Sequence, residues 1–178
     1  MKGNKFNLDF DGTTIYINVK SKISLNSRIF LVSCNLLLFS LMGIAVFEQI
    51  PALMFGTFML MGFLLRYTIW NIYGQETLVI NTRIIACRKI YLFYKTKLTT
   101  KRVGDKLNVI SYQVHGNREN KLVKVIFETY HMHNAPENIY EFVLPISTED
   151  AEMISYMVSL LYLNKVTFNI KDLKFNLN

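Results

Sequence analysis

Residues 29–47 read IFLVSCNLLLFSLMGIAVF, an apolar run that contains no charge. At about 1.5 Å per residue, a helix of this length reaches about 28 Å, which matches the roughly 30 Å hydrocarbon thickness of a bilayer. A short connection leads to Pro51, which suits the first turn of a new helix because its missing N–H costs nothing there. A second apolar run follows. We therefore predict a transmembrane helical hairpin over residues 29–73, with helices at about 29–47 and 51–70.

The apolar excess of the chain is local. Hydrophobic residues make up 51% of the sequence, and residues 29–73 hold most of the excess, while the flanks have the composition of a soluble protein. A buried hairpin inside a soluble protein is the alternative, but the remaining chain has too little apolar material to surround two such helices. A cleaved signal peptide is disfavoured because the first run begins late and lacks a small-residue cleavage site. We expect an integral membrane protein.

The ends of the hairpin have residues typical of a membrane interface. Arg66 lies near the end of the second run, where its long side chain can snorkel to the headgroups. Trp70 and Tyr73 match an aromatic belt, and Arg28 precedes the first run. We predict that these four side chains lie at the membrane interface.

Basic residues flank the hairpin on both sides, whereas the turn between its helices carries only Glu48. The positive-inside rule then places both termini in the cytoplasm. The flanking basic residues are Lys20, Lys22 and Arg28 before the hairpin, and Arg83, Arg88 and Lys89 after it.

Small and polar residues of the first helix indicate how the two helices meet. Ser33, Ser40 and Gly43 permit close approach, so we expect them at the helix–helix contact. Asn35 is expected to hydrogen-bond across this contact, a structural role that we prefer to a role in transport.

Residues 1–28 predict an N-terminal β-hairpin that joins the surface of the main domain. Phe6, Leu8 and Phe10 alternate with polar residues, Asp11-Gly12 is a tight-turn signal, and residues 13–19 alternate and are β-branched.

Residues 74–178 predict a β-rich domain that ends in a helix. Ser147 is expected to cap this helix, with Asp150 three residues on. The weak alternation of residues 166–177 indicates one more strand. Together these elements give an α+β domain, a small β-barrel or bent β-sandwich closed by the helix. The predicted strands are Glu76–Asn81, Arg83–Tyr91, Leu107–Val114, Leu122–Tyr130 and Ile139–Leu144.

Three stretches carry a resemblance to a known family: TIYINVKSK at 14–22, IWNIYGQETLVIN at 69–81 and LPISTEDAEMISYMVSLL at 144–161. Their order resembles bacterial two-helix membrane proteins with a pleckstrin-homology-like (PH-like) domain. The layout is also similar in length to the photosystem I assembly protein family. The resemblance implies a PH-like domain on the cytoplasmic face of a bacterial inner membrane, and a binding or assembly role without enzymatic activity.

The chain has a net charge of +7, and a basic segment follows the hairpin at residues 83–106, where the only acid is Asp105. Such a segment suits anionic headgroups or a protein partner, and a solvated surface is an equally good interpretation. Tyr91, Phe93 and Tyr94 interleave with the charges, as in a nucleic-acid platform, but the inner face of a strand or an interfacial anchor explains them at least as well. The hairpin argues against nucleic acid as the partner. The candidate lipid- or partner-binding residues are Arg83, Arg88, Lys89, Lys95, Lys97, Lys101 and Arg102.

Catalytic signatures are lacking: the sequence contains no nucleophile elbow, Walker loop, Rossmann glycine pattern or HExxH. We therefore expect no enzymatic activity and no cofactor. His131 and His133 would share one face of a strand, but a third metal ligand is not evident, so we predict no metal site. The alternative function is an immunity-type protein or a subunit of a small transport complex that acts through its helices.

Overall fold

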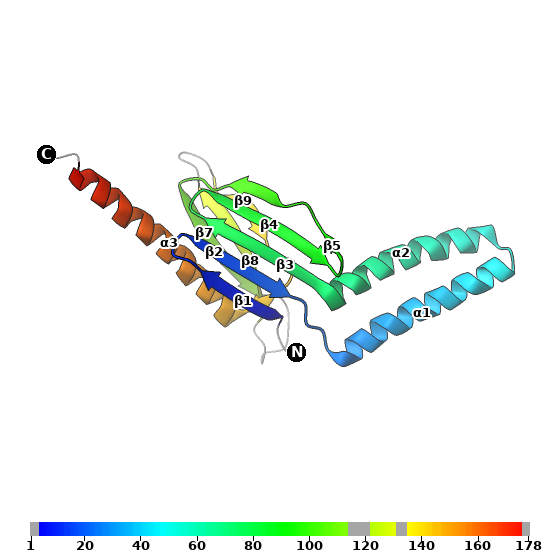
Figure 1. The fold of residues 1–178 in the computed structure, drawn as a ribbon. Coiled ribbons are helices and arrows are strands. Elements are labelled where there is room, and N and C mark those ends of the chain that lie inside the picture. Colours follow the sequence, from blue (N-terminus) through cyan, green and yellow to red (C-terminus); the bar gives the residue numbers. More distant parts are fainter. Residues whose placement is uncertain (1–3, 114–121, 131–134, 176–178) are drawn as a thin grey trace.

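A computed structural model describes residues 4–113, 122–130 and 135–175, and the side chains of the last helix as far as Leu163. A helical hairpin extends from one end of a β-rich domain and consists of α1 (Leu25–Phe47) and α2 (Pro51–Tyr73) (Figure 1). The end of the C-terminal helix extends from the opposite side of the domain. The predicted pair of long apolar helices is thus confirmed. Helix α1 begins before Ile29 because the Ser24 hydroxyl caps it, accepting the Ser27 N–H at 3.2 Å.

The helical hairpin is inserted between two neighbouring antiparallel strands. Strand β2 (Thr14–Lys20) pairs along its whole length with β3 (Gly74–Asn81). Where the chain leaves β2, the backbone N–H of Ser21 donates to the Gly74 carbonyl at 2.8 Å. The two ends of the inserted segment therefore meet at one point of the sheet.

Strand β1 (Lys5–Phe10) forms the predicted N-terminal hairpin with β2, and Gly12 in the turn has a φ of 91° that favours glycine. The first sheet has the order β1-β2-β3-β4-β5, and β6 also pairs with β4. The second sheet has the order β10-β8-β7, with β9 paired to β8. The further bounds are β4 (Ile84–Tyr91), β5 (Tyr94–Lys95), β6 (Thr99–Arg102), β7 (Lys106–Gln113), β8 (Leu122–Tyr130), β9 (Glu137–Glu141) and β10 (Ile146–Ser147).

Both sheets and the C-terminal helix α3 (Thr148–Phe175) share one hydrophobic core. The alternation of apolar residues along β2, β3 and β8 turns one face of each strand inward. The described strands form two sheets and no closed barrel. Together with the three described helices, they give the molecule an α+β layout. Buried members of the core include Ile15, Ile17, Val19, Leu78 and Ile80 from the first sheet, Val125, Phe127 and Ile146 from the second, and Ile154 and Leu161 from α3.

Helix α3 begins as predicted. The Ser147 hydroxyl donates to the Asp150 carboxylate at 2.7 Å and accepts the Asp150 backbone N–H at 3.1 Å. The strand predicted over residues 166–177 is wrong, because the helix continues to Phe175. The short strands β5, β6 and β10 were not predicted, since so few residues cannot display an alternation.

The predicted helix–helix contact is partly wrong. Ser33, Ser40 and Gly43 are exposed, and a Cβ added at Gly43 would meet nothing within 4 Å. Asn35 does bridge the helices, because its Nδ2 donates to the Thr68 hydroxyl at 2.8 Å. The residues with reduced exposure instead repeat at helical spacing: Leu31, Asn35, Leu38, Met42 and Ala45 on α1, and Met54, Thr57, Met61, Leu64 and Thr68 on α2.

Candidate membrane-facing site

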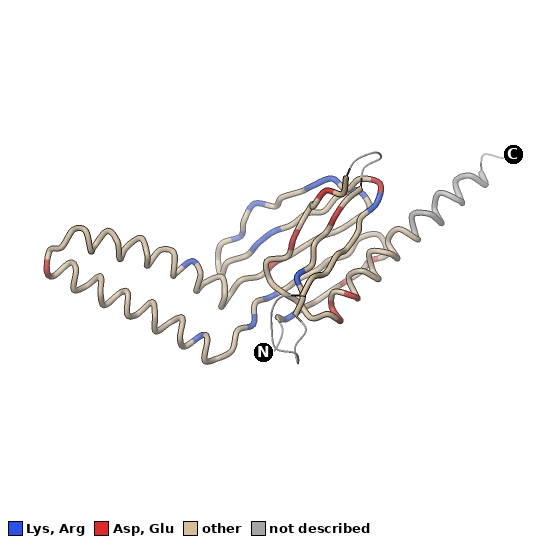
Figure 2. Tube along the Cα trace, turned by 180° about the vertical axis from the view of Figure 1, so that it is seen from behind, with Lys and Arg blue, Asp and Glu red and all other residues tan. Residues whose placement is uncertain are grey.

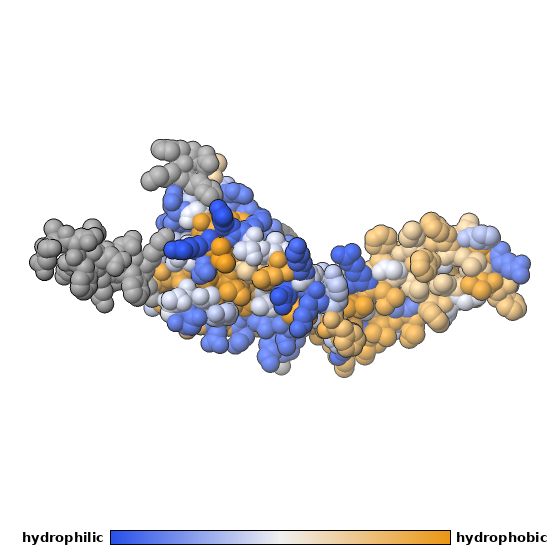
Figure 3. Space-filling view, turned by 45° about the horizontal axis from the view of Figure 1, so that its top comes forward, coloured by the Kyte–Doolittle hydropathy of each residue, from blue (hydrophilic) through white to orange (hydrophobic). Residues whose placement is uncertain are grey.

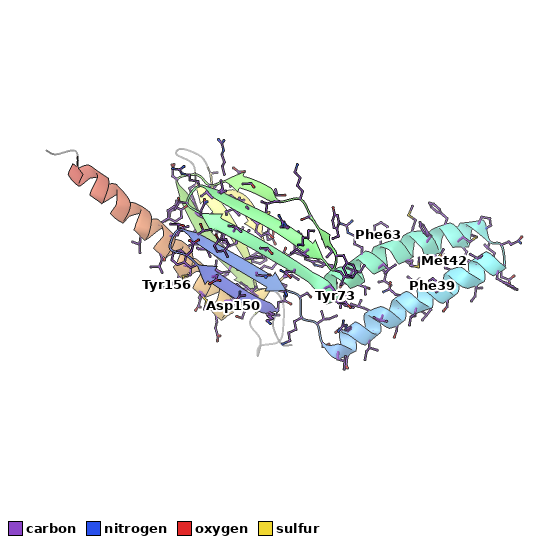
Figure 4. The ribbon with its side chains drawn as sticks, in the orientation of Figure 1. Phe39, Met42, Phe63, Tyr73, Asp150 and Tyr156 are labelled. Atoms are coloured by element: carbon purple, nitrogen blue, oxygen red, sulfur yellow. The ribbon has the colours of Figure 1, made fainter. Side chains whose placement is uncertain are left out.

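The surface of the helical hairpin is apolar. Both helices are long and apolar enough to cross a membrane, and only 11% of the most apolar window of each is buried. Figure 3 shows this largely apolar surface beside a domain whose surface mixes hydrophilic and apolar patches. Figure 4 labels Phe39 and Phe63 on the two helices, and they are 67% and 74% exposed. A patch of this extent is far larger than monomeric soluble proteins expose to water.

Three of the four predicted interface residues lie where the hairpin meets the sheets. The Arg28 guanidinium donates to the Tyr73 hydroxyl at 3.1 Å and lies 5.5 Å from the centre of that ring. Trp70 packs on Tyr91 of β4, with 4.7 Å between ring centroids. The Lys89 ammonium lies 6.0 Å from the Trp70 ring centroid. Aromatic and basic side chains therefore surround the base of the hairpin.

Arg66, the fourth predicted interface residue, lies further along α2. It is the single charged residue of that helix, which carries one blue position in Figure 2. Its side chain is exposed. Within the described part of the chain, no carboxylate lies within ion-pair distance of it. An unpaired arginine costs about 2.5–3.5 kcal/mol at the centre of a membrane helix and less near its ends. A negatively charged group supplied from outside the chain would lower that cost.

The turn between β4 and β5 places an apolar tip, formed by Leu92, Phe93 and Tyr94, beside α2. Phe93 is 91% exposed and Tyr94 67%. Leu92 has a φ of 49°, a conformation that leucine rarely adopts. Gly or Asn would suit that position better, so turn propensity does not explain an exposed leucine here.

Two adjoining grooves lie between α2 and the sheet, and the larger one separates α2 from the apolar tip. The larger groove has a volume of about 740 Å³ and is lined by Gly62, Leu65, Arg66 and Ile69 of α2 and by Tyr91–Tyr94 and Thr96 on the other side. The smaller groove, of about 320 Å³, is lined by Phe63, Arg66, Tyr67, Trp70, Lys89, Tyr91 and Val143. Arg66 and Tyr91 line both grooves.

Glu76 is a fully buried carboxyl next to this region. Its oxygens accept the backbone N–H of Leu144 at 3.0 Å, the N–H of Val143 at 3.0 Å and the Tyr140 hydroxyl at 3.2 Å, and lie 4.0 Å from the Lys89 ammonium. Burial raises the pKa of Glu76 above its ordinary value near 4.5, and these hydrogen bonds and Lys89 offset the increase only in part. Burial and the charge of Glu76 also raise the pKa of Tyr140, so its hydroxyl stays a donor.

The basic segment does not form one cluster. Lys95 pairs in register with Ile90 beside the apolar tip, and Lys97 follows it. Lys101 and Arg102 pair with Ile85 and Ile84 at the other end of β4. The partners of Lys95 and Lys101 lie five residues apart along β4, about 17 Å, which is more than the Debye length of about 8–10 Å in physiological salt.

The remaining basic candidates, Arg83, Arg88 and Lys89, also lie apart from one another on the sheet. Arg83 lies in the β3–β4 turn, at the end of β3 that is remote from α2. Arg88 lies opposite Thr77 on the other face of the sheet from Lys89, and its Nε is buried and has no hydrogen-bond partner among the described residues. The structure therefore brings Lys89, Lys95 and Lys97 toward the base of the hairpin.

Sequence reasoning missed the buried carboxyl of this site. The alternation of Glu76 with Leu78 and Ile80 places Glu76 on the buried face of its strand, which was a usable signal. Its partners lie more than sixty residues away, so nothing local identifies them. For the aromatic residues of the apolar tip, the sequence left open the inner face of a strand and an interfacial anchor, and the exposure of Phe93 and Tyr94 excludes the inner face.

His131 and His133 lie outside the described residues. Within the described ranges, no group of three His, Cys, Asp or Glu side chains could hold a metal ion. No protein-family model matches the sequence, and no curated protein matches it either.

Proposed function

We propose that the chain is an integral membrane protein whose β-rich domain binds the anionic surface of the membrane in which its hairpin is anchored. The observation that carries this proposal is the apolar tip, which lies beside α2 with Lys89, Lys95 and Lys97 close to it. An exposed phenylalanine flanked by lysines suits the membrane–water interface. There, apolar side chains insert between the lipid acyl chains and ammonium groups contact the lipid phosphates. The role is that of a binding module and not of an enzyme.

The location and fold family belong to the same proposal. The basic flanks of the hairpin support a cytoplasmic position for both termini, in the inner membrane of a bacterium. Two antiparallel sheets that share a core with a C-terminal helix support a PH-like domain. A membrane anchor keeps such a domain at high local concentration beside the bilayer without high intrinsic affinity. A protein partner held at this surface is the alternative occupant.

A soluble form of the domain tests the proposal. Lys20 and Gln75 are the last register pair before the hairpin, so a two-residue Asn-Gly turn can replace residues 21–74. After circular dichroism confirms its fold, this form is mixed with vesicles of phosphatidylcholine, with or without phosphatidylglycerol, and sedimented. We expect binding only to the vesicles that contain phosphatidylglycerol.

The position of the charges supplies a matched control. Lys95→Glu with Lys97→Glu is expected to weaken binding roughly 30-fold or more, at about 1 kcal/mol for each basic residue near the surface. Lys101→Glu with Arg102→Glu changes the charge equally at the far end of β4 and is expected to have a much smaller effect. Equal losses for the two pairs, or no preference for phosphatidylglycerol, would count against the proposal. A pull-down that returns one stoichiometric protein would then favour the alternative occupant.

A further inference from the structure

We propose that the two grooves at the base of α2 together bind one anionic phospholipid. Its phosphate lies on Arg66 and Lys89, and an acyl chain follows the larger groove between Gly62 and Phe93. The grooves adjoin, because both are lined by Arg66 and Tyr91. This inference rests on the proposed function, since it requires that the hairpin lies in a bilayer, and it names the lipid class and the place where it binds.

Charge complementarity favours an anionic headgroup. None of the residues that line either groove is acidic, and the single acid of the hairpin, Glu48, lies in the turn at its opposite end. Lys89 approaches Glu76 only to 4.0 Å, and its side chain stays 35% exposed. A phosphate offers Arg66 two oxygens in the geometry of the guanidinium fork, and it offers Lys89 a second charge contact.

The position of the grooves favours an occupant from the bilayer. Leu65 and Phe63 of the lining are exposed on the apolar surface of α2, which the proposed anchor places in lipid. Phe93 closes the other side of the larger groove. The volumes of about 740 and 320 Å³ lie in the range of ordinary ligand pockets, about 300–1,000 Å³. If the lipid phosphate binds Arg66, the acyl chain of the same lipid lies beside the apolar residues of the larger groove.

Two glycines of α2 provide a substitution that fills the groove and its matched control. Gly62 lines the larger groove, and a Cβ added there meets nothing within 4 Å, so the first carbon of the side chain in Gly62→Leu displaces no neighbour. A Cβ at Gly56 also meets nothing within 4 Å, and Gly56 lines neither groove. Gly56→Leu therefore makes the same change in the same helix away from the proposed site.

The single tryptophan of the chain is a natural reporter, because Trp70 lines the smaller groove. The full-length protein is reconstituted in phosphatidylcholine vesicles in which a rising fraction of lipid is brominated on an acyl chain, as either phosphatidylglycerol or phosphatidylcholine. Bromine quenches tryptophan fluorescence on contact. We expect half-maximal quenching at a several-fold lower fraction of brominated phosphatidylglycerol than of brominated phosphatidylcholine.

The variants decide whether this preference arises at the grooves. Arg66→Gln is expected to remove it, Gly62→Leu to reduce quenching by both lipids, and Gly56→Leu to leave the wild-type curves unchanged. Equal quenching by the two lipids in the wild type, or a preference that survives both Arg66→Gln and Gly62→Leu, overturns the inference. Relief of quenching by millimolar inorganic phosphate would indicate a free-phosphate site and also overturns it.

The outcome distinguishes this inference from the proposed function. If Trp70 shows no lipid preference while the soluble domain still binds phosphatidylglycerol vesicles, the groove assignment alone fails. If no brominated lipid quenches Trp70 at any fraction, the hairpin does not lie in the bilayer, and the proposed function fails with it.

Discussion

The Glu76 carboxyl joins the two sheets at the end of the domain next to the hairpin. It extends from β3 in the first sheet to the backbone N–H groups of Val143 and Leu144, which follow β9 in the second. Those N–H groups lie beyond the end of the strand, and the carboxyl supplies their acceptor. Leaving a buried N–H without a partner costs about 1–3 kcal/mol. Glu76 therefore holds the segment after β9 in place beside the proposed lipid site.

The raised pKa of Glu76 predicts a pH dependence of stability. Because the folded-state pKa lies above the ordinary value near 4.5, the folded state binds more protons than the unfolded state between these two values. The free energy of unfolding therefore falls as pH rises through that window and stays lower above it. In Glu76→Gln, the amide oxygen can accept the same N–H groups and this titration is absent. We expect the thermal midpoint of the variant in detergent to rise relative to wild type as pH increases from 4 to 8.

An exposed acid gives the control for this measurement. Glu152→Gln removes the same formal charge from an exposed position of α3 and is expected to follow the wild-type curve. A constant difference between Glu76→Gln and wild type over the whole pH range would show that Glu76 does not titrate in this window.

At the scale of elements, the β4–β5 hairpin has an apolar tip where a polar turn is usual. Its backbone adopts a positive φ at Leu92, which costs on the order of 1–3 kcal/mol for a residue other than glycine. Phe93 contributes almost nothing to the core, since it is 91% exposed. The positive φ therefore destabilises an isolated soluble domain without any compensating burial of Phe93, and membrane insertion of the tip would offset that cost.

Phe93→Ser is therefore expected to separate folding from membrane binding. Burying a phenylalanine side chain contributes about 1.5–3 kcal/mol, so the soluble form should lose roughly 10- to 100-fold in affinity for phosphatidylglycerol vesicles. Its thermal midpoint should not change, because the side chain contacts little in the folded domain. Tyr156→Ser is the control, since Tyr156 is 61% exposed on α3, away from the hairpin (Figure 4). Equal losses for Phe93→Ser and Tyr156→Ser would argue against insertion of the tip.

Elements with a strong local pattern were predictable from the sequence. Residues 14–20 and 76–80 alternate, Gly12 marks the turn, and Ser147 with Asp150 marks the start of α3. The contact between α1 and α2 was predictable only at Asn35, whose amide stands out in an apolar run. The rest was not predictable, because both helices are largely apolar on every side and composition does not identify the facing stripe. The site was only partly predictable, since Arg66 and Trp70 stand out in the sequence, whereas the grooves depend on the position of the β4–β5 turn.

At the scale of the whole molecule, the helical hairpin is an insertion within one β-hairpin. Ile15, Ile17 and Val19 of β2 are fully buried in the core, and β2 precedes the helical hairpin in the chain. The domain is therefore complete only when the chain on both sides of the helical hairpin is present. The pairing of β2 with β3 and the bond from Ser21 to Gly74 fix both ends of the inserted segment.

This topology predicts which shortened chain folds. The form with Asn-Gly in place of residues 21–74 keeps every core residue of both sheets and is expected to unfold cooperatively. A chain from which residues 1–20 are also absent loses three buried aliphatic side chains, at about 1.5–3 kcal/mol each. That loss of about 4.5–9 kcal/mol is comparable to the total stability of a typical domain, about 5–15 kcal/mol. We expect circular dichroism and thermal unfolding to show a folded first form and an unfolded second form. A folded second form would mean that the domain does not require β1 and β2. The helical hairpin would then be attached to a peripheral strand and not to a strand of the core.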